Sequence, residues 1–236
     1  MIFVGDIHEK WNHLTSLIRK FNIADEVLIQ VGDFGIGFRS AEKDKRRLRY
    51  LNKVLKTRNI QLYVVRGNHD NPSFFDGSYE DKFPNVHLVR DYQIKTIQGY
   101  NVLFIGGAIS VDRIDRKEGL DYWEDEVFNF DEEKLEAIEG VDIVVTHSAP
   151  KNVYPHVMGS VVEKWSKKEK GLKTELIKER QKLLDTFEIL NKKNNIKTWC
   201  YGHFHESYRS KYKNTNFALI NINEMYEYID DNPSTK

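Results

Sequence analysis

Five short apolar runs are each followed by a block of glycine and polar residues, and this pattern constrains the fold more than any other feature of the chain. The runs cover residues 2–4, 27–31, 62–65, 141–145 and 199–201. Short apolar runs bounded by glycine and polar residues are typical of buried strands. Because an open α/β sheet binds its ligands at the carboxyl ends of its strands, we expect five strands of one sheet to bring the blocks to one edge.

The blocks after these runs contain side chains that bind metal ions. They read Gly5-Asp6-Ile7-His8, Gly32-Asp33, Gly67-Asn68-His69-Asp70, Thr146-His147 and Gly202-His203-Phe204-His205, and they hold five of the eight histidines. Neutral imidazole and carboxylate bind divalent Zn, Mn or Fe, whereas the lack of thiolates argues against a structural zinc site. An isolated histidine is more often a surface or core residue, so it is the ordered set that predicts a metal centre.

The order and content of the blocks resemble the calcineurin-like metallophosphoesterase superfamily, in the form of its small bacterial and phage members. That superfamily carries D-x-H, G-D, G-N-H-[DE], H and G-H-x-H, and all five occur here in order between residues 5 and 205. The resemblance implies an α/β fold with two stacked mixed β-sheets flanked by helices, a four-layer αββα sandwich. It also implies a two-metal active site.

The resemblance assigns the metal ligands residue by residue. One ion would take Asp6, His8, Asp33 and His205, and the second would take Asp33, Asn68, His147 and His203, with Asp33 bridging the pair. We expect two divalent ions, with Mn first and Fe, Zn, Ni or Co as alternatives, because nitrogen and oxygen ligands alone do not select one metal. Asp6 and His8 are two residues apart, as are His203 and His205, and such pairs point to one face of a strand end.

Three residues in and beside the third block are candidate catalytic residues. In the superfamily the histidine of G-N-H-[DE] donates a proton to the leaving oxygen, and His69 matches it. Asp70 would either orient this imidazole or fill the acidic position of the motif without contacting it. Arg66 matches an arginine that binds phosphate in the protein phosphatase branch, and its alternative is a salt bridge under the strand end.

Two positions depart from the protein serine/threonine phosphatase branch of the superfamily. That branch continues its second block as G-D-x-x-D-R-G, whereas Ile36 and Gly37 stand here at its Asp and Arg. The bridging aspartate is kept, but the departure puts protein phosphatase activity in doubt.

A long connection over residues 106–126 resembles one in small bacterial and phage metallophosphoesterases. Long connections tend to carry specificity residues. Arg113 and Arg116 are therefore candidate phosphate contacts and Trp123 a candidate stacking surface. The alternative is a buried tryptophan beside surface arginines.

Charge is balanced over the whole chain but uneven along it. Lys plus Arg and Asp plus Glu number 36 each, which gives no general attraction to nucleic acid or to an acidic membrane surface. Basic residues gather between residues 39 and 58, where Leu48, Leu51 and Leu55 have helical spacing, and a lysine-rich helix is expected from about 172 to 190. We interpret both as solvated helix faces. The alternative is that the first steers anionic substrates or docks a nucleic acid.

A chain of 236 residues is expected to form one domain over residues 1–229, with a flexible tail at 230–236. Cys200 is the only cysteine, so an internal disulfide is excluded, and we expect this residue to be buried on a strand. The single cysteine, with no signal peptide and no membrane-spanning stretch, predicts a cytoplasmic protein without a membrane partner. The oligomeric state is left open.

We therefore expect a hydrolase of phosphoric esters. The resemblance implies hydrolysis of mono- or diesters by a metal-bridging hydroxide, and the favoured partner is a small, nucleotide-like phosphorylated substrate. Alternatives are a nuclease, a cyclic-nucleotide diesterase or a protein phosphatase with the same centre. A non-catalytic metal-binding scaffold is a weaker alternative, because every expected ligand and the acid are present.

Overall fold

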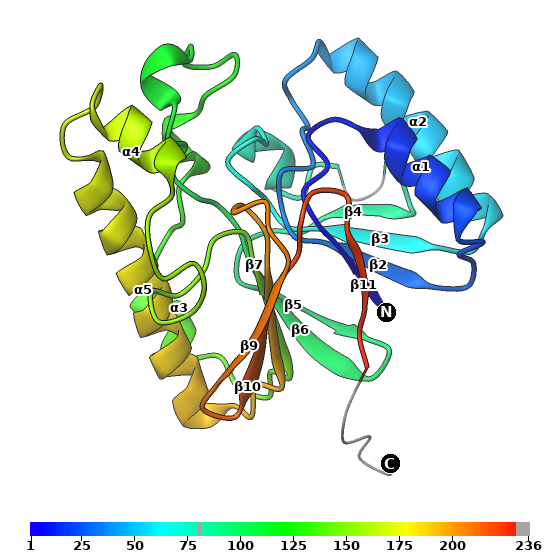
Figure 1. The fold of residues 1–236 in the computed structure, drawn as a ribbon. Coiled ribbons are helices and arrows are strands. Elements are labelled where there is room, and N and C mark those ends of the chain that lie inside the picture. The colour runs from blue at the N-terminus through cyan, green and yellow to red at the C-terminus, as the bar shows by residue number, and fades with distance from the viewer. Residues whose placement is uncertain (80–81, 230–236) are drawn as a thin grey trace.

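The computed structural model describes residues 1–79 and 82–229. The tail expected at residues 230–236 lies outside the described residues, so that expectation stays a prediction. Within the described part, two β-sheets face each other and helices cover the outer face of each (Figure 1). The expected fold class, two stacked mixed sheets flanked by helices, is confirmed.

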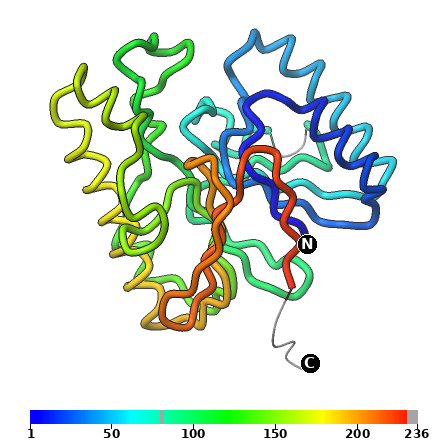
Figure 2. The backbone as a smooth tube through the Cα atoms, in the orientation of Figure 1, coloured from blue at the N-terminus to red at the C-terminus, as the bar shows by residue number. Residues whose placement is uncertain are grey.

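The first sheet has five strands in the order β11-β1-β2-β3-β4. β1, β2, β3 and β4 are parallel to their neighbours, and β11 adds to β1 in the antiparallel direction. The bounds are β1 Ile2–Val4, β2 Val27–Gln30, β3 Gln61–Val64, β4 Val86–Leu88 and β11 Met225–Glu227. The last described residues return to the first ones, because the backbone N–H of Tyr228 donates to the carbonyl of Met1 at 3.0 Å (Figure 2).

The second sheet has six strands in the order β5-β6-β7-β8-β10-β9. β6, β7, β8 and β10 form a parallel centre, and the edge strands β5 and β9 are antiparallel to it. The bounds are β5 Gln93–Ile97, β6 Tyr100–Ile105, β7 Ile143–Thr146, β8 Thr198–Tyr201, β9 Tyr208–Tyr212 and β10 Thr215–Leu219.

Helices connect the strands and cover the sheets. The α-helices are α1 Trp11–Lys20, α2 Ala41–Thr57, α3 Glu132–Glu136, α4 Ser160–Ser166 and α5 Leu172–Lys193. Three short 3-10 helices lie in the loops: η1 Pro72–Phe75, η2 Arg113–Asp115 and η3 Glu124–Glu126. The expected inner faces of α2 and α5 are confirmed, since their apolar residues are buried at Leu48, Leu51, Leu55, Leu172, Leu176, Leu183, Phe187 and Leu190.

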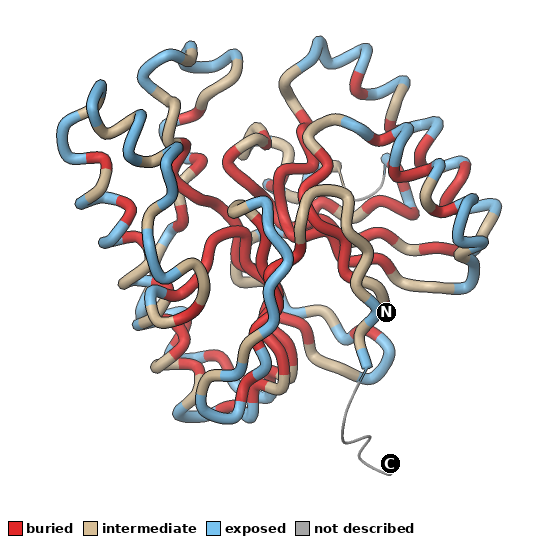
Figure 3. Tube along the Cα trace, viewed as in Figure 1, coloured by how far each residue is buried: buried red, intermediate tan, exposed pale blue. Residues whose placement is uncertain are grey.

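Three apolar layers hold these elements together. One lies between α1, α2 and the first sheet, one between the two sheets, and one between the second sheet and α5. Successive side chains of a strand point to opposite faces, so Leu28 packs toward the helices and Ile29 toward the other sheet. In β7, Val144 faces α5 while Val145 faces the first sheet. Both faces of these strands are buried (Figure 3), which explains why their sequences are continuously apolar.

The ligand-bearing strands belong to two sheets, and the expectation of one sheet is wrong. β1, β2 and β3 are neighbours in the first sheet, whereas β7 and β8 pair with each other in the second. Runs that are apolar on both faces carry no information on the strand with which they pair. The blocks still converge, because the sheets are stacked with these carboxyl ends on one side of the molecule (Figure 1).

Two further observations bear on the expected environment of the chain. Cys200 lies on β8 and is fully buried, as expected. Among the described helices, none combines the length and the apolar composition needed to cross a membrane.

Candidate metal centre

Four side chains from three loops form a compact first group. Asp6 and His8 follow β1, Asp33 follows β2 and His205 follows β8, and each offers one ligand atom within 4.8 Å of the others. His8 Nε2 lies 3.1 Å from His205 Nε2 and 3.7 Å from Asp33 Oδ2. His205 Nε2 lies 3.3 Å from Asp6 Oδ2. The four residues expected to hold the first ion are therefore brought together.

A second group lies on the other side of Asp33. His147, which follows β7, places Nε2 3.1 Å from Asp33 Oδ1 and 3.0 Å from Asn68 Oδ1. The His203 ring contacts the His147 ring at a centroid distance of 5.0 Å. The two carboxylate oxygens of Asp33 therefore face different groups, Oδ2 toward His8 and Oδ1 toward His147. This is the placement that a bridging ligand needs.

Left-handed turns, not strand alternation, aim several of these ligands. The φ angles are 43° at His8, 56° at Asp33, 70° at His203 and 55° at His205. All four residues lie beyond the ends of their strands. Asp6 and His8 are neighbours as expected, but the turn after the strand brings them together, and not a shared face of the strand. Residues with positive φ other than glycine cost on the order of 1–3 kcal/mol each and persist where function fixes them.

Hydrogen bonds fix the orientation of two ligands in the second group. His147 Nδ1 lies 2.8 Å from the carbonyl oxygen of Val31, so Nδ1–H donates to it and Nε2 presents its lone pair to the centre. The amide nitrogen of Asn68 donates to Ser110 Oγ at 2.9 Å, which leaves Asn68 Oδ1 for the centre. Sequence reasoning missed Ser110, because an ordinary serine in a long loop gives no signal.

Close backbone approach explains glycine at two of the blocks. A Cβ on Gly67 would collide with the carboxylate and backbone nitrogen of Asp33, and a Cβ on Gly202 would collide with the Asp6 carboxylate. Gln30 adds a second kind of support, because its side chain bonds both the N–H and the carbonyl of Gly32. Gln30 is the one polar residue in the run 27–31, and this interruption is the signal by which it could have been found.

The electrostatics of the centre favour a bound cation. Burial alone would raise the pKa of Asp33, but the neighbouring imidazoles, led by His147, hold that pKa well below its ordinary value. Burial would lower the pKa of His147, yet the Asp33 charge raises it to about 10. Burial lowers the pKa of His8, and burial together with His147 holds the pKa of His203 well below its ordinary value. The centre thus combines the neutral imidazoles of His8 and His203 with the Asp33 carboxylate, and Asp33 attracts a positive charge that here is the proton on His147.

The donor set fits divalent metal ions. The ligand atoms of the first group span 4.8 Å at most, close to twice a metal–ligand bond of roughly 2.0–2.2 Å. Carboxylate, imidazole and amide donors without a thiolate suit the metals expected from the sequence. The residues of the first group therefore fit a divalent metal ion, and Asp33 also faces His147 in the second group.

His69 lies beside the first group as the candidate acid. Its ring packs edge-on against His8 at a centroid distance of 4.9 Å and stacks on Phe38 at 5.6 Å. Its backbone N–H donates to Asp33 Oδ1 at 2.7 Å, so the same residue is tied to the bridging carboxylate. Burial, together with the nearby Arg116, lowers the pKa of His69.

The Asp70 carboxylate bonds backbone N–H groups and not the His69 imidazole, so its expected catalytic role stays a prediction. Its buried carboxylate accepts four backbone N–H groups, those of Phe34, Gly35, Ile36 and Gly67, at 2.7–3.1 Å. Asp70 therefore ties the loop after β2 to the loop after β3. Of the two expectations for this residue, the structure shows the one without contact to the acid.

The Arg66 side chain is bonded to other parts of the protein and does not point a free donor at the metal centre. Its Nη2 lies 2.9 Å from Asp91 Oδ2, and its terminal nitrogens donate to the carbonyls of Asp125, Glu126 and Val127. The side chain is 6% exposed. Because its terminal donors are used and it is buried, Arg66 shows the alternative that the sequence left open, an ion pair under the strand end.

The long connection contributes a second residue to the centre besides Ser110. Arg116 Nη2 lies 2.8 Å from His69 Nε2, whereas Arg113 pairs with Glu169 and Glu175. Trp123 is buried, not a free stacking surface, and packs edge-on against Phe38. The connection therefore places Arg116 at the acid and the tryptophan behind it.

A two-sheet sandwich whose facing loops gather carboxylates and imidazoles defines a class of metal-binding α/β proteins. The chain belongs to the calcineurin-like phosphoesterase family, whose sequence profile matches residues 1–207. Members of this family are metal-dependent phosphoester hydrolases, which agrees with the donor set described above. None of the curated proteins matches the sequence.

Solved structures share the fold at low identity. The protein TT1561 of Thermus thermophilus is 13% identical with a TM-score of 0.52, and the match covers 94% of this chain and 89% of that one. A putative 5'-nucleotidase from Staphylococcus aureus in complex with alpha-ketoglutarate is 14% identical with a TM-score of 0.53, over 94% of this chain and 48% of that one. This chain thus spans about half the length of the second protein. Likeness at this identity shows the fold alone.

Proposed function

We propose that this chain is a two-metal phosphoesterase that hydrolyses mono- or diesters of small, nucleotide-like phosphates in the cytoplasm. One observation carries the proposal: Asp33 lies between two groups of donors. Asp6, His8 and His205 are on one side of it, and His147 and Asn68 are on the other. A carboxylate shared between two donor groups supports two ions in place of one. Manganese is the first choice, with Fe, Zn, Ni or Co as alternatives.

Two divalent ions, when bound, would supply Lewis acids for the phosphoryl oxygens and a water of lowered pKa. The chain supplies the rest. His69 is placed to hand a proton to the leaving oxygen, since it lies at the edge of the first group and its backbone is anchored to Asp33. Arg116 is placed to neutralise charge on the phosphoryl group beside that acid.

The loop after β2 favours a small substrate over a phosphoprotein. Ile36 is fully buried and Gly37 has a φ of 93°, so neither can support the acid or grip phosphate as the protein phosphatase branch would require. Arg66, the other candidate grip, is occupied by Asp91 and by backbone carbonyls. Among the candidate arginines, only Arg116 contacts His69, the candidate acid. One arginine beside the acid is enough to bind the phosphoryl group of a small phosphoester.

A panel of aryl phosphate monoesters and diesters, run with Mn, Fe, Zn, Ni and Co, tests the proposal. We expect turnover of at least one ester that depends on added metal. Asp33→Asn should abolish it while the circular dichroism spectrum stays that of the wild type, because the shared carboxylate is lost but the fold is not. Full activity of Asp33→Asn in metal-supplemented buffer would contradict the proposal, and diester hydrolysis alone would favour the nuclease or cyclic-nucleotide alternative.

A further inference from the structure

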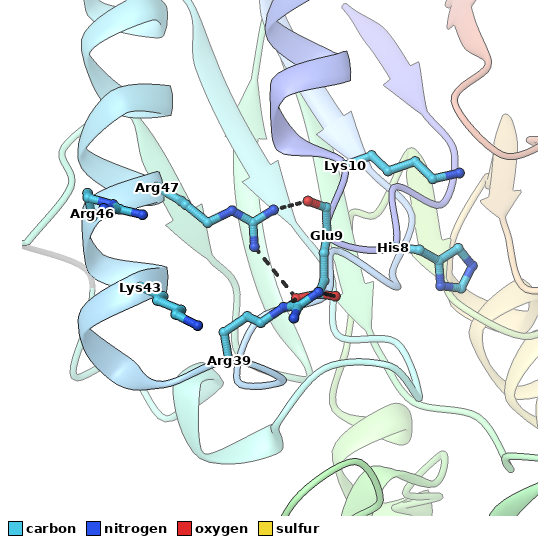
Figure 4. A pocket seen from close by; sticks show the side chains of 7 residues that line it. All are labelled: His8, Glu9, Lys10, Arg39, Lys43, Arg46 and Arg47. Atoms are coloured by element: carbon cyan, nitrogen blue, oxygen red, sulfur yellow. Dashed lines mark hydrogen bonds and ion pairs between the residues drawn. The ribbon is translucent and has the colours of Figure 1, made fainter.

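A basic cavity adjoins the metal centre on the side of α2. It has a volume of about 360 Å³ and is lined by His8, Glu9 and five cationic side chains, Lys10, Arg39, Lys43, Arg46 and Arg47. Lys43, Arg46 and Arg47 come from α2, and Arg47 reaches from the helix to Glu9 (Figure 4). The basic residues noted in the sequence after Asp33 are therefore not only a solvated helix face.

Two arginines of the cavity are held in place. Arg39 forms a bidentate pair with the Glu9 carboxylate, at 2.6 Å and 3.0 Å. Arg47 lies over the Trp11 ring at 4.4 Å and donates to the Glu9 carbonyl oxygen. A fixed guanidinium loses little freedom on binding an anion, so these two side chains form a preorganised floor.

The other three cations have no acidic partner in the structure. Lys10, Lys43 and Arg46 form no ion pair with any residue that the structure describes, and all three are exposed. Five cations thus face two carboxylates, Glu9 in the lining and the buried Asp44, which lies 3.9 Å from Arg47. Such a concentration of unpaired positive charge attracts an anion with several charges.

His8 connects the cavity to the metal centre. Its backbone lies next to Glu9, and its imidazole extends away from α2 toward the first ligand group (Figure 4). An anion in the cavity would therefore lie beside a phosphoester held at the centre. His8 lines the cavity and belongs to the first ligand group, so the two sites adjoin each other.

We propose that this cavity binds a second phosphate group of the substrate, so that the enzyme prefers small molecules with two phosphate groups, such as nucleoside diphosphates. The inference rests on the proposed function. None of the described lining residues is Phe, Tyr or Trp, so nothing in the cavity would stack a base. That lack favours a phosphate group over single-stranded nucleic acid as the occupant.

The test compares adenosine 5'-diphosphate with adenosine 5'-monophosphate at saturating metal. We expect the wild type to hydrolyse the diphosphate with the higher kcat/KM. Part of this preference comes from the phosphoanhydride, whose leaving group is better than the alkoxide of the monophosphate, so the comparison of variants carries the test. The double variant Lys43→Ala/Arg46→Ala should lower the diphosphate-to-monophosphate ratio by roughly tenfold, because two exposed charge-assisted contacts are lost. The matched control, Lys45→Ala/Lys53→Ala, removes the same charge from exposed positions of α2 that do not line the cavity and should keep the ratio.

Three results would overturn the inference. One is a wild-type ratio near one, and another is an equal loss of ratio in the double variant and its control. The third is a short single-stranded oligonucleotide that binds more tightly than adenosine 5'-diphosphate through Lys43 and Arg46, which would assign the cavity to nucleic acid. Failure of the proposed function looks different, since no aryl phosphate would then be turned over with any metal. In that case calorimetry would still test the cavity. Adenosine 5'-diphosphate should bind the wild type more tightly than the double variant, and equal affinities would overturn the inference.

Discussion

Arg116 Nη2 lies 2.8 Å from His69 Nε2, so a guanidinium from the long connection contacts the candidate acid directly. Asp112 holds this arginine at 2.7 Å, four residues earlier in the chain. An arginine stays protonated in proteins, so in this arrangement His69 Nε2 accepts the hydrogen bond. A bound phosphoryl oxygen offers Arg116 a better acceptor than the imidazole does, which would free Nε2 to take up the proton that it then hands to the leaving oxygen.

Arg116→Ala is expected to lower kcat/KM for a small phosphoester by about 100-fold, the cost of removing one donor that stabilises charge in the transition state. Metal content should stay that of the wild type, since Arg116 contacts no ligand group except through Ser110 and His69. Steady-state kinetics with metal analysis measures both quantities.

Arg113→Ala is the matched control, because Arg113 lies three residues away in the same connection and pairs only with Glu169 and Glu175 among the described residues. Its kcat/KM should stay within about twofold of the wild type. A larger loss in Arg113→Ala than in Arg116→Ala would show that the connection, not the guanidinium at His69, sets the rate.

His69→Ala should keep the metal content and slow substrates with poor leaving groups most. A nitrophenolate leaves without a proton, whereas an alkoxide needs one, so the acid contributes only to the second. The ratio of kcat for an alkyl phosphate to kcat for nitrophenyl phosphate therefore falls in the variant. Loss of bound metal together with an unchanged ratio would assign His69 to metal binding.

Asp70→Asn is expected to act on stability. The buried carboxylate satisfies four backbone N–H groups, and an amide in its place leaves some of them without an acceptor. The free energy of unfolding should fall on the order of 1–3 kcal/mol. Urea denaturation measures it. Unchanged stability with a large loss of kcat would instead support the expectation that Asp70 orients the His69 imidazole.

Glu179 on α5 should make stability depend on pH. Burial raises the pKa of this carboxyl from 4.5 to about 7, and Oε2 has no hydrogen-bond partner among the described residues. Between about pH 4.5 and pH 7 the folded chain holds a proton that the unfolded chain has released, so stability falls as the pH rises through this window.

Glu179→Gln removes this titration, and its stability should exceed that of the wild type at pH 8 by on the order of 1–3 kcal/mol. Thermal or urea unfolding at several pH values measures the difference. A variant whose stability falls with pH as steeply as that of the wild type would contradict the assignment.

The sequence predicted residue types and their order well, and it predicted geometry only where a local rule applied. The runs before Asp6, Asp33 and His147 form strands, because apolar runs bounded by glycine have few other uses in a folded chain. Which sheet each strand joins depends on pairing, and a run that is apolar on both faces does not encode it. The convergence of His8 and His205 from the two sheets is therefore a property of the fold.

Long polar side chains were the least predictable part of the site. Arg66, Arg113 and Arg116 were all candidate phosphate contacts, yet only Arg116 reaches the acid. Their distant partners, Asp91, Glu175 and His69, lie 25 to 62 residues away in sequence, and such distances carry no periodic signal. The contacts of Asp70 were not predicted, because the N–H groups that its carboxylate accepts, those of residues 34–36, belong to a loop whose shape the sequence does not reveal.

Anomalous diffraction from crystals grown with Mn²⁺ tests the central claim most directly. The account predicts two peaks per chain, one bounded by Asp6, His8, Asp33 and His205 and the other by Asp33, Asn68, His147 and His203, with Asp33 contacting both. A single peak, or peaks remote from Asp33, would contradict it.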